Sequence, residues 1–250
     1  SVPFSALIDK NGQYLVERFP ISTTPSLSLM NTLSKLPHIN NNNNNKNVFL
    51  VGNPIGSGLD FTEVEVNKCQ QLFEQSEYNC HRLIRSNATL PNVKSILENT
   101  RLQHIHFACH SGFNGKNNYS LFKGSLDLSR RRNGKAAKLY SEDIIQLGNG
   151  IQSDTVFLSC CHSGKGNNKQ QGLIGLVWSF HCTGALSVVA SHWELPDTDL
   201  TVRMIECFYD NMINKKLNKA QSLRQAQLIA INQYHHDPRS WAPIFLSGLI

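Results

Sequence analysis

The sequence predicts an α/β domain in which about six mostly parallel strands form a doubly wound sheet between helices. Short, continuous apolar runs alternate along the chain with longer segments of helical spacing, and Gly, Pro and Asn residues separate the two kinds of segment. Continuous apolar runs are typical of strands buried on both faces, and their alternation with helices is typical of a parallel sheet. The chain has 250 residues, of which 40 % are hydrophobic, so a sizeable core is expected.

Each predicted strand is a short apolar run. The strands are residues 47–54 (NVFLVGNP), 81–86 (HRLIRS), 104–109 (HIHFAC), 155–160 (TVFLSC), 186–191 (LSVVAS) and 242–248 (APIFLSG). Each predicted helix carries apolar residues three or four positions apart. The helices are residues 25–36 (PSLSLMNTLSKL), 61–75 (FTEVEVNKCQQLFEQ), 89–99 (TLPNVKSILEN), 141–148 (SEDIIQLG), 170–184 (QQGLIGLVWSFHCTG), 197–213 (DTDLTVRMIECFYDNMI) and 219–234 (KAQSLRQAQLIAINQY).

The remaining segments read as hairpins and loops. Alternating apolar residues predict one hairpin over residues 4–19 and a second over residues 119–140, which contain a Gly-rich turn. A run of Asn at residues 40–46 cannot pack a core and predicts a surface loop. We therefore expect residues 1–46 to form an N-terminal extension of hairpin, helix and poly-Asn loop within the same domain, and residues 47–250 to form the core.

Composition limits the classes of function. The seven cysteines are an odd number without Cys-x-x-Cys spacing, which argues against a secreted disulfide framework and a zinc ribbon and favours the reducing cytoplasm. No apolar run is long enough to span a membrane. The net charge is +6, but the basic stretch at residues 130–138 has no interleaved aromatic residues, so nucleic acid is not an expected partner. The chain begins Ser-Val-Pro, so we expect a fragment or processed product of a longer protein.

One tetrapeptide, Cys-His-Ser-Gly, occurs twice, at residues 109–112 and 161–164, and each copy lies at the end of a predicted strand. Working residues of such sheets lie just beyond the carboxyl ends of the strands. A zinc site is disfavoured because adjacent strand residues point to opposite faces. A disulfide between Cys109 and Cys161 is geometrically possible but unexpected in a reducing compartment. Cys109 and Cys160 also fit small apolar core residues.

The remaining interpretation pairs His110 with Cys161. If the two strands are neighbours, their ends lie ~5 Å apart. A nearby His can take the proton of a thiol and later return it to a leaving amine, and the thiolate is the nucleophile. A helix that starts after Cys161 adds a favourable dipole, and the Gly-containing turns leave backbone N–H groups for an oxyanion. This chemistry needs no metal and no other cofactor.

The chain resembles the CHAT domain, a caspase-like cysteine peptidase domain of clan CD that is commonly fused to tetratricopeptide repeats. The resemblance rests on HIHFACHSG, TVFLSCCHSGKG, GLIGLVWSFHCTGALSVVASHWELPDTD, KAQSLRQAQ and SWAPIFLSG, which follow one another over nearly the whole chain. The segment HWELPDTD is also similar to separases, and CCHSG is similar to the nucleophile segment of metacaspases. The resemblance implies a caspase–hemoglobinase-like fold.

The same resemblance implies a cysteine endopeptidase that cuts a protein substrate, with Cys161 as nucleophile and His110 as base. It also implies an upstream repeat region in the parent protein that regulates the activity. In the family, the backbone N–H groups of the nucleophile and of a Gly after the His form the oxyanion hole. Here Ser111 stands between His110 and Gly112, so either residue is a candidate for the second N–H. This departure favours the alternative, a weak or inactive CHAT-like interaction module.

A second departure concerns the substrate pocket. Metacaspases place an Asp two residues before the nucleophile to bind a basic side chain, whereas this chain has Ser159. We expect Trp193 to give the pocket an apolar face and Glu194 or Asp197 to give it a negative charge, which favours Lys or Arg before the cut. Asp197 also fits a helix cap. We expect His104 and His106, which alternate with Ile105, to be structural histidines with satisfied hydrogen bonds.

Overall fold

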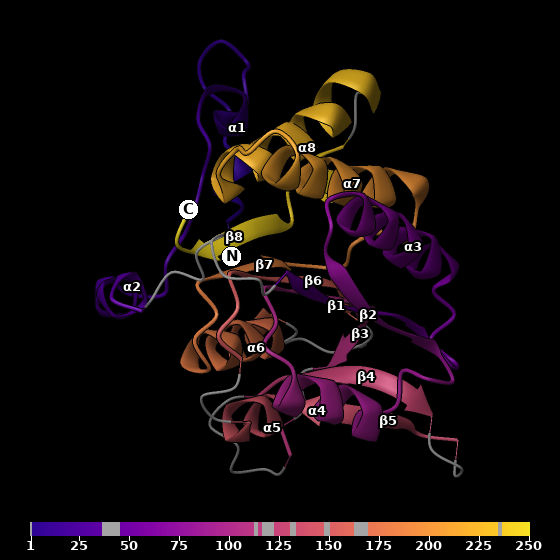
Figure 1. Cartoon of the computed structure of the whole chain (residues 1–250). Coiled ribbons are helices and arrows are strands. Elements are labelled where there is room, and N and C mark those ends of the chain that lie inside the picture. Colours follow the sequence, from indigo (N-terminus) through magenta and orange to yellow (C-terminus); the bar gives the residue numbers. More distant parts are fainter. Residues whose placement is uncertain are drawn as a thin grey trace.

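The computed structural model describes residues 2–36, 46–112, 115–116, 123–130, 134–147, 151–162, 170–234 and 237–250, with the backbone alone at residues 161–162, 170–174 and 234. A central sheet lies between two layers of helices (Figure 1). The predicted fold class is therefore confirmed.

The sheet follows the order β2-β1-β3-β6-β7-β8, and two further strands, β4 and β5, extend it from β3. The pairs along this path are parallel except β7 with β8, which are antiparallel. The strands are β1 (Asn47–Pro54), β2 (Asn79–Arg85), β3 (His104–Gly112), β4 (Ser125–Arg130), β5 (Ala136–Tyr140), β6 (Thr155–His162), β7 (Ser187–Ser191) and β8 (Ile244–Gly248). The six predicted strands thus form the main path, and the predicted hairpin at residues 119–140 supplies β4 and β5.

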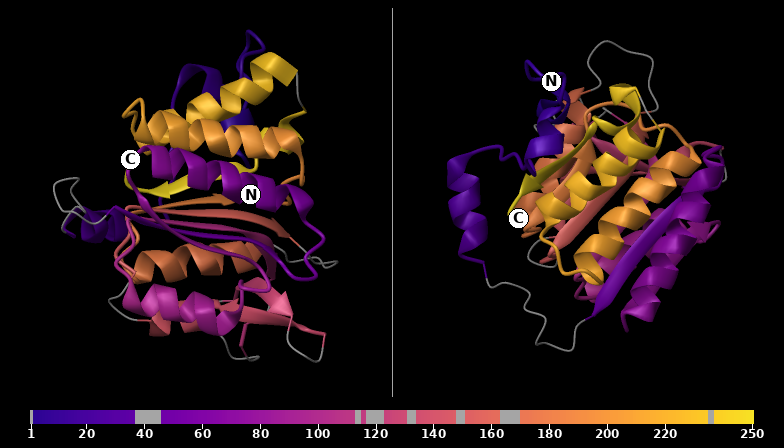
Figure 2. Two further views of the ribbon diagram at one scale, coloured as in Figure 1. Left: turned by 45° about the vertical axis from the view of Figure 1, so that its right-hand side comes forward. Right: turned by 90° about the horizontal axis from the view of Figure 1, so that it is seen from above.

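Helices cover both faces of the sheet. The helices are α1 (Leu15–Arg18), α2 (Leu27–Ser34), α3 (Asp60–Gln75), α4 (Leu90–Asn99), α5 (Ser141–Gln146), α6 (Gln170–Cys182), α7 (Asp199–Ile213), α8 (Lys219–Tyr234) and α9 (Pro238–Trp241). Figure 2 shows α3, α7 and α8 on one face and α4, α5 and α6 on the other. None of the helices in the described part of the chain is long and apolar enough to cross a membrane.

The core has one half on each face of the sheet, and β1 shows why. Val48 and Leu50 are fully buried among residues of α3, α7 and α8, whereas Phe49 and Val51 are fully buried among residues of α4 and α6. Successive strand residues point to opposite faces, so a strand that is covered on both sides needs apolar residues at every position. The continuous apolar runs of the sequence therefore reflect this two-sided burial.

The predicted hairpin over residues 4–19 is present only as a short antiparallel contact around residues 7–15. A 3₁₀ turn (Phe4–Ala6) and the helical turn α1 occupy this segment, and a single antiparallel bridge joins Ile8 to Tyr14. Local hydrogen bonds explain the difference. The Asp9 carboxylate accepts from the amides of Asn11 and Gln13 at 2.8 and 3.1 Å, and the Glu17 carboxylate accepts from the Tyr14 amide at 2.6 Å. These bonds favour a turn and a helix start over a strand.

The chain then returns to the sheet and continues into α2, which confirms the predicted helix. The amide of Thr23 donates to Leu246 O at 2.9 Å, and the amide of Gly248 donates to Thr23 O at 3.0 Å. Ser26 caps α2 by accepting from the Leu29 amide at 3.0 Å. The N-terminal segment thus packs against β8, as expected for part of the same domain. The predicted poly-Asn loop lies outside the described residues except for Lys46, and the domain boundary stays a prediction.

Candidate active site

Strands β3 and β6 are neighbours in the centre of the sheet and end at the same edge. Their parallel register makes His110 and Cys161 Cα partners, one position beyond the partners Cys109 and Cys160. The predicted adjacency of the two tetrapeptide strands is therefore correct. Their backbones lie ~5 Å apart at this point. The side chain of Cys161 lies outside the described residues.

The other cysteines of the two tetrapeptide regions have the predicted core position. Cys109 and Cys160 are free thiols, 0 % and 2 % exposed, and pack in the core half that faces α4 and α6. Among the described side chains, no group of three or more His, Cys, Asp or Glu residues converges as metal ligands.

A backbone carbonyl fixes the ring of His110. Its Nε2 lies 2.7 Å from Ser57 O, and because a carbonyl oxygen only accepts, Nε2 carries the proton and donates it. In the neutral ring, Nδ1 then carries the lone pair. Nδ1 is buried and has no hydrogen-bond partner among the described residues. The ring is thus held in the tautomer that leaves Nδ1 able to accept a proton.

The loop that offers this carbonyl follows β1 and is tied to the start of α3. Ser57 Oγ donates to Asn53 Oδ1 at 2.9 Å and accepts from the Leu59 amide at 3.3 Å. Asn53 Nδ2 in turn donates to the Glu63 carboxylate at 2.9 Å. These contacts hold Ser57 O in a defined place next to His110.

The β4–β5 hairpin holds the same loop from the other side. The guanidinium of Arg130 donates to Gly56 O at 3.0 Å and to Gly134 O at 2.9 Å, and the Ile55 amide donates to Ser129 Oγ at 3.2 Å. Gly56 has φ +81°, and a Cβ atom built on it would lie 1.9 Å from Arg130 Nε. Only Gly allows Arg130 to lie this close to the loop. The hairpin therefore positions, through the loop, the carbonyl that orients His110.

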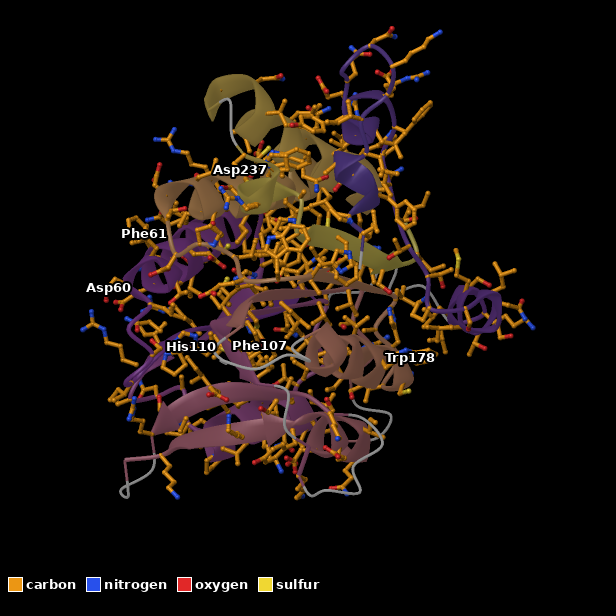
Figure 3. All side chains as sticks on the ribbon, turned by 180° about the vertical axis from the view of Figure 1, so that it is seen from behind. Asp60, Phe61, Phe107, His110, Trp178 and Asp237 are labelled. Atoms are coloured by element: carbon orange, nitrogen blue, oxygen red, sulfur yellow. The ribbon has the colours of Figure 1, made fainter. Side chains whose placement is uncertain are left out.

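A pocket of about 280 Å³ lies beside His110, between this loop and the hairpin. Its polar lining includes Asp127 and Arg130, and its apolar lining includes Ile55 and Leu128. Figure 3 shows His110 at the end of the molecule where the start of α3 lies, with Asp60 and Phe61 labelled nearby.

Ser159, which stands at the position of the metacaspase acid, is buried and contacts the carboxylate of Glu65. Its Oγ donates to Glu65 Oε2 at 3.2 Å, and Ser159 is 4 % exposed. Glu65 comes from α3 and also accepts from His106 Nε2 at 2.6 Å. The Nδ1 atom of His106 lies 3.1 Å from the Tyr209 hydroxyl. Burial, together with the negative charges around it, raises the pKa of Tyr209 well above its usual value.

The predicted structural role of the strand histidines holds for His106, whose two ring nitrogens both have partners. It is wrong in one respect for His104. Its ring is buried against Phe73 and Tyr78, and its Nδ1 atom has no partner in the described part of the chain. Burial lowers the pKa of His104 to about 4, because the charged ring loses its hydration there.

The three predicted pocket residues after β7 lie in different surroundings. Trp193 is half-buried and donates from Nε1 to Arg239 O at 3.0 Å, while Glu194 is exposed. Asp197 accepts from the Phe61 amide at 3.3 Å, so it binds the first turn of α3 and not α7, whose N-cap is Thr198. Burial raises the pKa of Asp197, whereas the Phe61 amide and the charge of nearby His110 lower it. Asp197 therefore lies against the start of α3, and its charge interacts with that of His110.

The two candidates for the second oxyanion donor belong to the end of β3. Ser111 pairs with His162 of β6 on one side and with Leu126 of β4 on the other, and Gly112 pairs with Ser125. Gly112 is also close to its neighbours, since a Cβ atom there would lie 2.9 Å from Ser125 Oγ. The oxyanion roles of Ser111, Gly112 and Cys161 stay predictions.

Sequence reasoning missed Ser57, Glu65 and Arg130. Ser57 acts through its carbonyl, which every residue has, and only its place in the Gly-rich turn after β1 was a signal. Glu65 lies on the buried side of α3, where a single acid within an apolar pattern was the available signal. Arg130 was counted with the basic stretch. Its contact with Gly56 joins residues far apart in the sequence, which no local pattern reveals.

Solved structures of other proteins resemble the fold of this chain. The chain is similar in structure to the Arg-specific cysteine proteinase gingipain R (RgpB) of Porphyromonas gingivalis, with a TM-score of 0.57 and 12 % identity over 81 % of this chain and 45 % of that chain. It is also similar to separase in the Saccharomyces cerevisiae separase–securin complex, with a TM-score of 0.55 and 17 % identity over 92 % of this chain and 14 % of that chain.

At these identities the likeness shows the fold alone, which is caspase–hemoglobinase-like. The chain spans less than half the length of either of these two proteins. No curated protein sequence matches it. The CHAT domain profile matches residues 1–249, which is nearly the whole chain, and the chain therefore belongs to the CHAT domain family.

Proposed function

We propose that this chain is a cysteine endopeptidase that hydrolyses peptide bonds of a protein substrate, with Cys161 as nucleophile and His110 as general base. The observation that carries the proposal is the pairing of His110 and Cys161 as Cα partners at the ends of neighbouring parallel strands. The hydrogen bond from His110 Nε2 to Ser57 O supports it, because it leaves Nδ1 as the nitrogen that can accept a proton.

The first half of the reaction forms a thioester. His110 Nδ1 takes the proton of the Cys161 thiol, and the sulfur attacks the carbonyl carbon of the peptide bond. The C–N bond then breaks, and the proton on Nδ1 passes to the leaving amine. Ser57 O accepts from Nε2–H throughout, so it orients the ring and stabilises its charged form.

The second half releases the acid product. A water molecule gives a proton to His110 Nδ1 and attacks the thioester carbon. The C–S bond breaks, and the Cys161 sulfur recovers the proton. The negative oxygen that forms in each half needs two donors, for which the backbone N–H of Cys161 and that of Ser111 or Gly112 are our candidates.

The substrate residue before the cut is proposed to be Lys or Arg. Ser159 itself carries no charge, but its hydroxyl binds the carboxylate of Glu65, and Asp197 lies within electrostatic range of His110. One acid thus contacts the residue two positions before the proposed nucleophile, and a second interacts with the charge of the proposed base, with Trp193 and Glu194 as further candidate walls of the pocket. The similar gingipain is itself described as Arg-specific. Matched peptides that differ only in this residue test the preference, and equal or better cleavage after Leu, Met or Asp contradicts it.

The proposed setting is a cytoplasmic parent protein in which a repeat region regulates the peptidase. The free thiols of the six cysteines with described side chains suit a reducing compartment. Nucleic acid is not a proposed partner of this domain. The second candidate function is a weak or inactive interaction module, which the insertion of Ser111 before Gly112 favours.

Labelling with a peptidyl acyloxymethyl ketone separates the two functions, because this reagent alkylates an activated thiolate. We expect one adduct at Cys161 by mass spectrometry and none in Cys161→Ala. Cys182→Ala is the matched control, since Cys182 is an accessible thiol whose pKa is raised by partial desolvation, so it lacks an activated thiolate. Labelling that persists in Cys161→Ala, or that His110→Ala leaves unchanged, contradicts the peptidase and supports the interaction module.

A further inference from the structure

The pocket between the β1–α3 loop and the β4–β5 hairpin has no role in the proposed chemistry so far. We propose that it binds the substrate residue immediately after the cut and favours an acidic side chain there. This inference rests on the proposed function, because it uses the direction in which His110 passes its proton.

The sheet order gives the position of the pocket relative to the proposed dyad. Strand β3 has β6, with Cys161, on one side. Strand β4 pairs with Ser111 and Gly112 of β3 and therefore lies on the opposite side. His110 lines the pocket, together with the loop and the hairpin. His110 thus stands between Cys161 and the pocket.

The chemistry gives the direction of the substrate. The acyl carbon becomes bonded to Cys161, and the leaving nitrogen receives its proton from His110. A peptide in this orientation crosses from β6 to β3 as it passes from the acyl side to the amine side of the cut. The residue that follows the leaving nitrogen therefore reaches the pocket. A volume of about 280 Å³ is at the lower end for ligand sites and suits one side chain.

The charges of the pocket favour an acid. Asp127 lines it but is paired with Lys138 of β5, so this acid is already neutralised. Arg130 donates to the carbonyl oxygens of Gly56 and Gly134, and in the described part of the chain no carboxylate pairs with it. Carbonyl oxygens do not cancel its charge. The pocket therefore carries one uncompensated positive charge, while the exposed side chain of Ile55 can cover the methylene groups of a Glu side chain.

Two other acids, at or near the start of α3, do not change the positive sign of the pocket's net charge. Asp60 and Asp197 belong to the start of α3 and its contact with the segment after β7, and neither lines the pocket. Arg130 is partly exposed to solvent, so screening weakens its effect. We expect about a fivefold higher kcat/KM for Glu than for Lys at the position after the cut, the range of an exposed ion pair.

The test changes the charge of the pocket and leaves Arg130 in place, because Arg130 also positions the loop. The substrates are fluorogenic peptides with the best residue before the cut, differing only in Glu, Gln or Lys after it. Lys138→Gln frees the charge of Asp127, which cancels that of Arg130, so the Glu:Lys ratio should fall to about one. Asp127→Asn frees Lys138, so the ratio should rise above the wild-type value. The double variant Asp127→Asn/Lys138→Gln restores the net charge and should return the ratio to that of the wild type.

The ratio is measured within each variant, so partial unfolding of a variant does not alter it. Cleavage with the same Glu:Lys ratio in all four proteins, or a preference for Lys in the wild type, overturns the pocket assignment and leaves the peptidase intact. If no peptide is cut and Cys161 is not labelled by the acyloxymethyl ketone, both the proposed function and this inference fail.

Discussion

Replacement of Gly56 by Ala tests whether the β4–β5 hairpin positions His110. Gly56 has φ +81°, where an L-residue costs about 1–2 kcal/mol. Its new Cβ atom would also lie 1.9 Å from Arg130 Nε, so the guanidinium must leave and lose its bonds to Gly56 O and Gly134 O. We assign these exposed bonds about 1 kcal/mol together. The expected loss in the free energy of unfolding is therefore about 2–3 kcal/mol.

Gly12→Ala is the matched control, because Gly12 has φ +80° and nothing lies within 4 Å of a Cβ atom there. It should lose only the backbone cost of about 1–2 kcal/mol. In an Arg130→Ala background, Gly56→Ala should likewise lose only the backbone cost. Urea unfolding of the four single and double variants and the wild type measures these differences.

The functional readout is the rate at which the acyloxymethyl ketone labels Cys161. When the loop shifts, Ser57 O no longer selects the Nε2–H tautomer of His110, and Nδ1 is less available as a base. If the shift raises the activation free energy of thiol deprotonation by about 1.4 kcal/mol, the labelling rate falls about tenfold. Gly12→Ala should label at the wild-type rate. If Gly56→Ala matches Gly12→Ala in both stability and labelling rate, the hairpin does not position His110 and the reasoning is refuted.

Three further predictions concern the buried polar groups and the chemistry. Burial holds the pKa of His104 at about 4, below its value in the unfolded chain. The unfolded chain therefore binds the extra proton, and the free energy of unfolding falls as pH drops from about 6.5 towards 4. His104→Phe should make the free energy of unfolding, measured in urea at several pH values, less dependent on pH, and an unchanged pH dependence contradicts the assignment. Glu65→Gln, which weakens the bonds to His106 and Ser159, should lower the free energy of unfolding by about 2 kcal/mol, and a neutral effect would show that these bonds contribute no stability. Peptidase activity should survive chelators and be lost on thiol alkylation, and zinc-dependent activity would reverse the dyad assignment.

The fold could be predicted because each strand and helix has its own local hydrophobic pattern, and these patterns alternate along the chain. A continuous apolar run such as residues 48–51 requires burial on both faces, and this is what the two core halves around β1 provide. The same kind of reasoning was only partly right at residues 4–19, where one antiparallel bridge forms. Apolar residues do alternate there, but the carboxylates of Asp9 and Glu17 accept hydrogen bonds from nearby amides. These bonds favour a turn and a helix start over longer strands. Side-chain bonds to the backbone compete with strand pairing, and a pattern of hydrophobicity does not register them.

The candidate dyad was predictable because both halves occupy equivalent positions, the ends of two buried strands. The sequence cannot show which strands are neighbours, and the register of β3 with β6 supplied that step. The hydrogen bond that orients the His110 ring could not be predicted, for a different reason. A carbonyl oxygen has no signature in the residue type, so Ser57 became visible only when the loop after β1 was seen against β3.

Ser159 departs from the metacaspase pattern, in which an acid at this position binds a basic side chain of the substrate. By itself, Ser159 therefore does not support a strict preference for Lys or Arg. In the fold, the hydroxyl of Ser159 donates to Glu65 from α3, so a carboxylate stands next to the same point of β6 although a different element supplies it. A longer acid at 159 would have to share this buried space with Glu65, and two carboxylates there would repel each other. Ser159 and Glu65 are therefore a matched pair, and in urea unfolding Ser159→Asp should destabilise the wild-type chain by more than it destabilises a Glu65→Gln variant.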